Sequence, residues 1–188
     1  MDFYRKLAAI LILVTITAAI VILPVQGEER KLGEYEVKAV FIYNLAKFIE
    51  WPDKSLDNNP TLTVYILGDD PFGANLDAIK GKLIKGKSVV VKQIDSPAAL
   101  KNVGILFFSS SEKKQLQDIL KGISRLPILT VGDTQSFANR GVMVNFYIEN
   151  NKIRFEINTE AAKLAGLKIS SNLLKMGKII APPVGKEK

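Results

Sequence analysis

The sequence predicts a protein of the α/β class, with a mostly parallel sheet covered by helices on both faces and an antiparallel hairpin at one edge. Apolar segments of strand length alternate along the chain with segments of helical periodicity, the pattern of a parallel sheet with crossover helices. The strand segments 64–67, 89–91 and 105–108 are almost continuously apolar, as expected of strands covered on both faces. Further on, Glu149-Asn150-Asn151 separates two more strand segments, and asparagine tolerates the positive φ of a tight hairpin turn.

The first half of the chain is predicted to begin with a helix over residues 34–50, which Pro52 stops. One face of this helix repeats at helical spacing and comprises Val37, Val40, Phe41, Asn44, Leu45 and Phe48, whereas Lys38, Lys47 and Glu50 lie elsewhere. The elements expected next are a strand at 62–67, a helix at 71–83, a strand at 89–94, a short helix at 97–101 and a strand at 105–109. Asp70 is placed to cap the helix that Pro71 would begin.

The second half opens on Ser109-Ser110-Ser111-Glu112, a capping-box sequence that predicts the start of a helix. The buried stripe of that helix comprises Leu116, Ile119, Leu120 and Ile123. The elements expected after it are a strand at 128–131, a helical turn at 133–138, strands at 142–148 and 152–157, a helix at 159–165 ended by Gly166, and a final helix at 170–179. No internal repeat or interior linker interrupts this order, so residues 28–188 are predicted to form a single domain.

The first 27 residues have the pattern of a cleavable signal peptide. Arg5 and Lys6 give a positive start, residues 7–23 are uncharged and apolar, and Val25-Gln26-Gly27 offers small residues at the cleavage site. We therefore expect export to the periplasm. An uncleaved membrane anchor is the alternative, because the apolar run is near the lower length limit for a spanning helix.

The chain of 188 residues has neither cysteine nor histidine and carries a formal net charge of +7. It cannot form disulfides, and it lacks the commonest general base and the usual transition-metal ligands, so neither a metal nor another cofactor is predicted. The excess of basic over acidic residues favours binding to acidic partners, anionic lipid or the cell envelope. One segment is rich in lysine and contains Lys80, Lys82, Lys85 and Lys87. A surface that stacks nucleic-acid bases would have aromatic residues between such lysines, and this segment has none. We therefore interpret it as a solvated loop and predict no nucleic-acid partner.

Polar motifs that could carry chemistry have simpler interpretations. Asp69 and Asp70 could hold a hard cation, but no further oxygen ligands are evident, and helix capping by Asp70 is favoured. The loop from Gly68 to Gly73 places two acids where backbone amides would have to face a phosphate. The serines at 109–111 have no base beside them, and Asp133 is interpreted as a turn residue. An enzyme is therefore not predicted.

The loop after the strand at 62–67 is nevertheless the best candidate for a binding surface. It leaves the carboxyl end of a buried strand, where open α/β sheets hold ligands and partners. We expect Asp69, Asp70, Phe72 and Gly73 to form a partner- or ligand-binding surface, with Trp51 nearby. Phe72 and Trp51 lie at element ends beside prolines and acidic residues, so each is either an exposed anchor or a lid packed over the core.

Several stretches, taken in order, resemble the YfiR family; they are 35–52, 62–73, 106–109, 129–133 with Phe137-Ala138, 154–158 and 165–174. The resemblance implies a Rossmann-like fold and an exported protein that restrains an inner-membrane diguanylate cyclase by binding its periplasmic sensor domain. It also implies cysteine pairs, which this chain lacks. Gly104 stands where a relative would be expected to have a cysteine. A redox-sensing role is therefore put in doubt, while partner binding is not.

From the residues and the resemblance together we expect an exported, non-enzymatic regulator that lowers cyclic di-GMP and biofilm output. Its partner would be a membrane protein with a periplasmic sensor domain, either a diguanylate cyclase or a sensor kinase. Formation of a homodimer is left as an open alternative. The alternative is a small-solute-binding sensor of the envelope that uses the crevice at the strand ends. A hydrolase relying on carboxylates alone is the least favoured hypothesis.

Overall fold

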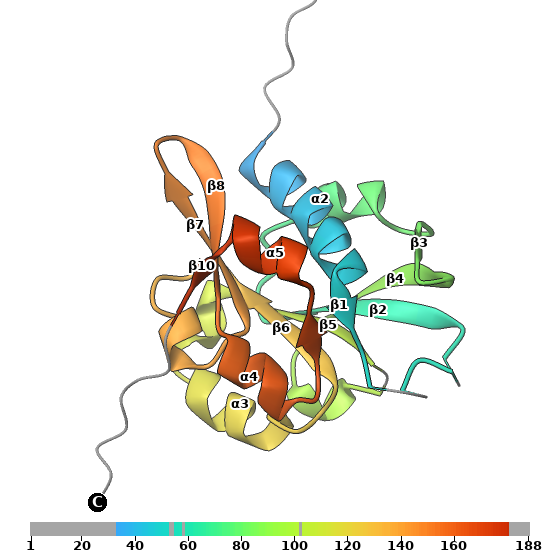
Figure 1. Ribbon diagram of the computed structural model, residues 1–188. Coiled ribbons are helices and arrows are strands. Elements are labelled where there is room, and N and C mark those ends of the chain that lie inside the picture. Colours follow the sequence, from blue (N-terminus) through green and yellow to red (C-terminus); the bar gives the residue numbers. More distant parts are fainter. Residues whose placement is uncertain (1–32, 53–54, 58, 102, 181–188) are drawn as a thin grey trace, which may run out of the picture. The chain divides into compact units, whose positions relative to one another are not determined.

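The computed structural model describes residues 33–52, 55–57, 59–101 and 103–180 (Figure 1). The predicted signal peptide at 1–27 and the residues after 180 lie outside these ranges. Within them, no helix has both the length and the apolar composition needed to cross a bilayer.

An eight-stranded sheet with the order β10-β8-β7-β6-β5-β2-β4-β3 forms the centre of this part of the chain. Its strands are β2 (Thr61–Leu67), β3 (Leu83–Ile84), β4 (Lys87–Ile94), β5 (Gly104–Phe108), β6 (Ile128–Gly132), β7 (Val144–Glu149), β8 (Lys152–Ile157) and β10 (Lys178–Ile179). The neighbours from β4 through β2, β5 and β6 to β7 run parallel, whereas β3–β4 and β7–β8 are antiparallel pairs. The predicted mostly parallel sheet with an antiparallel hairpin is confirmed; the two-residue β10 adds a parallel strand outside that hairpin.

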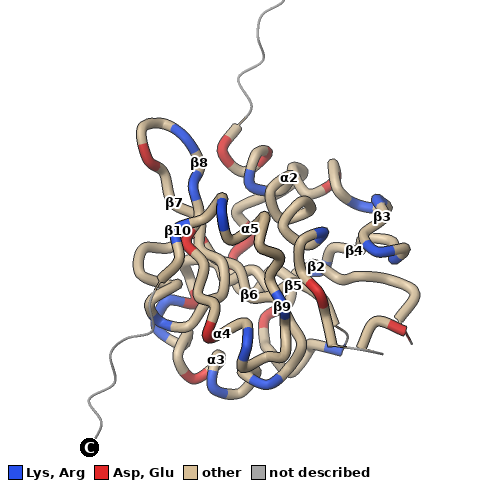
Figure 2. Tube along the Cα trace, in the orientation of Figure 1, with Lys and Arg blue, Asp and Glu red and all other residues tan. Residues whose placement is uncertain are grey.

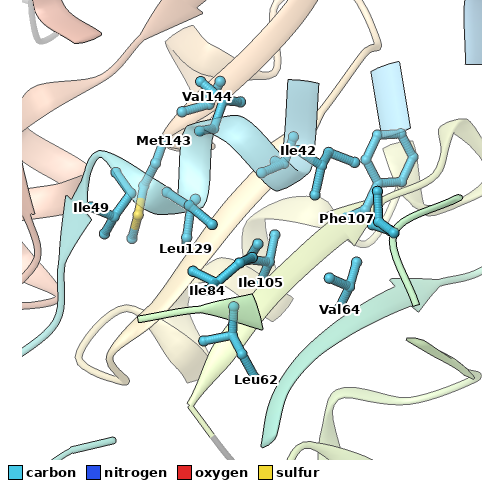
Figure 3. Packing of buried hydrophobic residues seen from close by; sticks show 14 of the residues in the cluster. Ile42, Ile49, Leu62, Val64, Ile84, Ile105, Phe107, Leu129, Met143 and Val144 are labelled. Atoms are coloured by element: carbon cyan, nitrogen blue, oxygen red, sulfur yellow. The ribbon is translucent and has the colours of Figure 1, made fainter. Parts of the chain in front are cut away.

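Helices cover both faces of the sheet, as predicted. On one face α2 (Glu34–Lys47) and α5 (Ser171–Met176) pack over alternate residues of the strands, among them Leu62, Val64 and Ile66 of β2. Figure 3 shows Ile42 of α2 in this cluster together with residues of β2, β5 and β6. On the other face α3 (Leu116–Ile123) packs against Tyr65 and Leu67. Among the described residues the remaining α-helix is α4 (Thr159–Leu164), and the 3-10 helices are η1 (Gly73–Ala78), η2 (Pro97–Ala99), η3 (Ser110–Lys113) and η4 (Ala138–Arg140).

The first predicted helix is wrong at its end, because α2 ends at Lys47 and not at Glu50. Residues Ile49–Glu50 instead form β1, which pairs antiparallel with β9 (Lys168–Ile169) in a separate two-stranded sheet. Ile49 is fully buried. Burial of this isoleucine against a distant segment outweighs the helical pattern.

Other predicted helices are also shorter than expected, among them the short one at 97–101, of which only η2 (Pro97–Ala99) forms. The helix predicted at 71–83 is only the 3-10 helix η1, because Gly73 and Gly81 have φ of +53° and +74°, which no continuous α-helix contains. Ser109 makes no capping hydrogen bond, and η3 precedes α3, which begins at Leu116. The last helix ends at Met176, since Gly177 is extended and β10 follows.

The turn residues predicted after β7 and after α4 are confirmed, whereas the helical turn predicted at 133–138 is wrong, because Ser136 has φ +70° and the 3-10 helix η4 begins only at Ala138. Asn150 and Asn151 have φ of +49° and +58° in the β7–β8 hairpin. Gly166 has φ +72° after α4, the left-handed conformation expected of a residue that ends a helix.

Gly104 begins β5 beside Thr63 of β2. A Cβ atom at this position would collide with the carbonyl oxygen of Thr63, which is backbone and cannot move aside. The local backbone therefore requires glycine, and a cysteine here would need a different approach of the two strands.

Candidate functional site

The carboxyl ends of β2, β5 and β6 surround a hollow of about 300 Å³ beside the first turns of α2. The parallel strands follow a doubly wound order in which the connections change direction between β2 and β5, the place where such folds hold their ligands. Ten residues line the hollow: Glu34, Tyr35, Lys38, Asp69, Asp70, Pro71, Ser109, Ser110, Asp133 and Thr134.

A buried ammonium group forms one wall of the hollow. Lys38 is 3% exposed, and its Nζ lies 2.6 Å from Oδ2 of Asp133 and also pairs with Glu34. The prediction that Lys38 lies away from the buried side of its helix is therefore wrong. A buried ammonium needs a partner charge, and Asp133 supplies one from a segment far along the chain.

Tyr35 completes this network. Its hydroxyl donates a hydrogen bond of 2.9 Å to the same Oδ2 of Asp133. Burial, reinforced by the hydrogen bond to Asp133 and by its negative charge, raises the pKa of Tyr35 well above the ordinary value, so the hydroxyl stays protonated and remains a donor. Asp133 is thus more than the predicted turn residue, because it accepts from two side chains of α2.

The loop after β2 forms the opposite wall, and backbone contacts fix its shape. The backbone N–H of Phe72 donates to Oδ1 of Asp70 at 2.8 Å, so Asp70 stabilises a turn and caps no α-helix. The backbone N–H of Asp69 donates to Oγ of Ser111 at 3.1 Å. Asp69, Asp70 and Gly73 are exposed. Two carboxylates are therefore presented to solvent on a loop tied to its neighbours.

Phe72 is a core lid, and the alternative that it is an exposed anchor is wrong. The side chain is 1% exposed, and its ring packs edge-on against Tyr35 at 5.2 Å and Phe107 at 4.8 Å between centroids. These contacts hold the loop down on the sheet from beneath.

Trp51 does not lie near this loop. It follows β1 at the far end of α2, a helix of 14 residues and hence about 21 Å long, whereas Tyr35 at the near end contacts Phe72. Its side chain is 8% exposed and packs in the core cluster, so Trp51 is also a lid.

Ser109 lines the hollow, and its hydroxyl oxygen is itself fully buried, with no accessible surface. The residue is buried, and among the described residues its Oγ has no hydrogen-bond partner. A buried hydroxyl without a partner is costly unless another molecule, water included, satisfies it.

The assembled site is acidic. Four of its lining side chains are carboxylates and one is an ammonium that two of those carboxylates already neutralise. Within the described ranges no group of three or more metal-ligating side chains is arranged to hold a metal ion. The site can attract a cationic group or a basic protein surface.

Sequence reasoning identified Asp69, Asp70 and Gly73 correctly as residues of an exposed loop at a strand end but missed Tyr35, Lys38, Ser109 and Asp133. A signal for Asp133 was available. Gly132-Asp133 follows a buried apolar strand, just as Gly68-Asp69 does, and parallel strands bring such ends to one edge of the sheet. Nothing local indicated that the ammonium of Lys38 would reach it.

Comparison with known families gives one match. A family model described as YfiR/HmsC-like matches residues 35–178, from the first turn of α2 to β10. This span includes all the residues that line the hollow except Glu34. No curated protein matches the chain significantly.

Proposed function

Because this chain belongs to the YfiR/HmsC-like family, whose members are periplasmic regulators of diguanylate cyclases, we propose that it binds and restrains the periplasmic sensor domain of such a membrane enzyme. The restrained cyclase would make less cyclic di-GMP, and biofilm formation would fall. The domain itself is a regulator and catalyses no reaction.

The exposed carboxylates of Asp69 and Asp70, which we call the acidic rim of the hollow, are the observation that carries this proposal. Within the described residues the carboxylate of Asp69 takes part in no hydrogen bond or ion pair, although its backbone is fixed. An exposed charge on a fixed loop loses little conformational freedom on binding. We propose Asp69, Asp70 and Gly73 as contact residues, with Phe72 holding their loop in place; the buried Trp51 is left out.

Reversing one rim charge tests the proposal. Asp69→Lys should weaken binding of the cyclase sensor domain by at least about tenfold and raise cellular cyclic di-GMP, because a basic partner surface would meet a lysine. Asp118→Lys makes the same change of charge at an exposed position of α3 and should alter neither quantity. The melting temperature of both variants should match that of the original chain. A folded Asp69→Lys protein that still restrains the cyclase would contradict the assignment.

Export is part of the proposal. We propose that residues 1–27 are removed, so that the protein begins at Glu28 and is released from cells by osmotic shock. N-terminal sequencing of the released protein checks this. Full-length protein that stays in the membrane fraction would show a tethered domain, and the partner proposal would be unaffected.

A small-solute sensor is the second candidate, and the hollow at the strand ends, which Ser109 lines, favours it. A hollow of about 300 Å³ is at the lower end of the range for ligand pockets, so the solute would be small and polar. Native mass spectrometry of the periplasmic protein should then show a retained molecule that Ser109→Ala loses. Identical spectra for the two proteins would remove this candidate.

A further inference from the structure

The segment from Ala78 to Ile94 contains five lysines and no acidic residue. It includes the edge strand β3, which pairs with the start of β4. Figure 2 shows the resulting concentration of basic positions around these two strands. We call residues 81–88 the basic hairpin; its lysines are Lys82, Lys85 and Lys87, while the preceding Lys80 is paired with Asp77.

Two ammonium groups meet at one aromatic ring beside this hairpin. The Nζ atoms of Lys47 and Lys82 lie 3.9 Å and 5.5 Å from the centre of the Tyr43 ring. The hydroxyl of Tyr43 donates to the carbonyl oxygen of Leu83 at 3.2 Å, which ties the ring to the hairpin. Among the described residues neither lysine forms an ion pair with an acid. The two ammonium groups are thus held at one ring without a neutralising carboxylate, and Nζ of Lys47 also donates a hydrogen bond of 3.0 Å to Oδ1 of Asn44.

The tip of the hairpin carries a lysine where its backbone favours another residue. Lys85 has φ +49° and is followed by Gly86 at φ +78°, a two-residue turn in which asparagine or glycine is preferred at the first position. Lysine in the left-handed region is strained. Such a departure from local preference is typical of positions with a function.

An exposed leucine lies between these lysines. Leu83 is 63% exposed, whereas its neighbour Ile84 is 1% exposed and anchors the hairpin in the core. Lysines alone could serve to protect an edge strand from pairing with another chain. Edge protection requires neither an exposed leucine nor a lysine with positive φ.

From these observations we propose that the basic hairpin docks this domain on an anionic phospholipid surface. Lys47, Lys82, Lys85 and Lys87 would lie against the phosphate groups, while Leu83 enters the boundary between headgroups and acyl chains. An apolar side chain framed by lysines with flexible stems suits the membrane interface better than an acidic protein surface. The surface lies at the amino ends of the strands, away from the acidic rim, so this inference goes beyond the proposed function and does not depend on it.

Vesicle binding of the purified protein tests the proposal. The original chain should bind vesicles of equal parts phosphatidylglycerol and phosphatidylcholine, should not bind phosphatidylcholine alone, and should dissociate at about 0.5 M salt. The triple variant Lys82→Gln, Lys85→Asn, Lys87→Gln should bind roughly 100-fold more weakly, at about fivefold for each lysine. The single variant Leu83→Gln should lose about tenfold.

Matched variants separate this surface from general charge and from partner binding. The triple variant Lys113→Gln, Lys114→Gln, Lys121→Gln removes the same charge from exposed positions elsewhere and should bind as the original chain does. Asp69→Lys should also leave vesicle binding intact. No binding to the anionic vesicles, or equal losses in the two triple variants, would overturn the proposal. It would equally be overturned if the hairpin variant lost a protein partner but kept its vesicle affinity, because the surface would then serve an acidic protein.

Discussion

One helix connects two regions in which lysine has opposite roles. Near the start of α2 the ammonium of Lys38 is buried against Asp133, whereas in its last turn the ammonium of Lys47 is exposed and lies over Tyr43. The ammonium of Lys38 is therefore neutralised within the fold, although the carboxylates of Asp69 and Asp70 at the same strand ends are exposed. Beside the basic hairpin, the ammonium groups are held in place but remain exposed to solvent. The comparison teaches that a cation's place in the fold, more than its place in the sequence pattern, decides whether it is neutralised inside the protein or left exposed at the surface.

The largest expected loss comes from the loop that bears the acidic rim. Phe72→Ala should lower the free energy of unfolding by about 3–5 kcal/mol, because a fully buried ring leaves a cavity between Tyr35 and Phe107. Leu83→Ala in the basic hairpin should change it by no more than about 0.5 kcal/mol, since that side chain is exposed. Urea unfolding measures both; similar values for the two variants would erase the contrast.

Next in size is the pair of lysines in α2. Lys38→Ala should cost about 3 kcal/mol, because the carboxylate of Asp133 would be left buried without its partner charge. Lys47→Ala should cost less than about 1 kcal/mol, the loss of an exposed contact with the Tyr43 ring. Thermal unfolding of the two variants, side by side, measures the difference. If Lys47→Ala proved as damaging as Lys38→Ala, Lys47 would have to be counted as a structural residue.

A smaller effect of opposite sign is expected at the hairpin tip. Lys85→Asn should raise the free energy of unfolding by about 0.5–1 kcal/mol, since asparagine adopts positive φ with less strain. Lys87→Asn, on the regular strand β4, should give no gain. Calorimetry of the two variants checks this. A loss of stability in Lys85→Asn would mean that the lysine side chain stabilises the fold.

No effect is expected from reductant on either region. The chain contains no cysteine, so its melting temperature should be the same with and without dithiothreitol. Any shift would have to arise from another molecule in the preparation.

The strands were the most predictable part of the fold. Covering both faces of β2 and β5 requires near-continuous apolar runs, and these runs located the two strands to within a residue or so. The asparagine turn likewise predicted the β7–β8 hairpin. By contrast, β1, β9 and β10 have two residues each, and pairing with distant segments, not local pattern, creates them.

The candidate site was predictable only where it depends on one segment. The exposed acids after β2 follow from the strand end and its turn residues. The burial of Phe72 depends on Tyr35 and Phe107, and the burial of Lys38 depends on an aspartate 95 positions away. Neither contact leaves a trace in the local sequence, so the lid and the buried ion pair required the structure.

Photo-cross-linking from single positions in living cells tests the central claim most directly, which is that the acidic rim, and not the basic hairpin, contacts the regulated protein. A photoreactive residue at position 69 should give an adduct with a membrane protein that has both a periplasmic sensor domain and a diguanylate cyclase domain, identified by mass spectrometry. The same residue at position 85 should give no such adduct. An adduct with that protein from position 85 and none from position 69 would contradict the account.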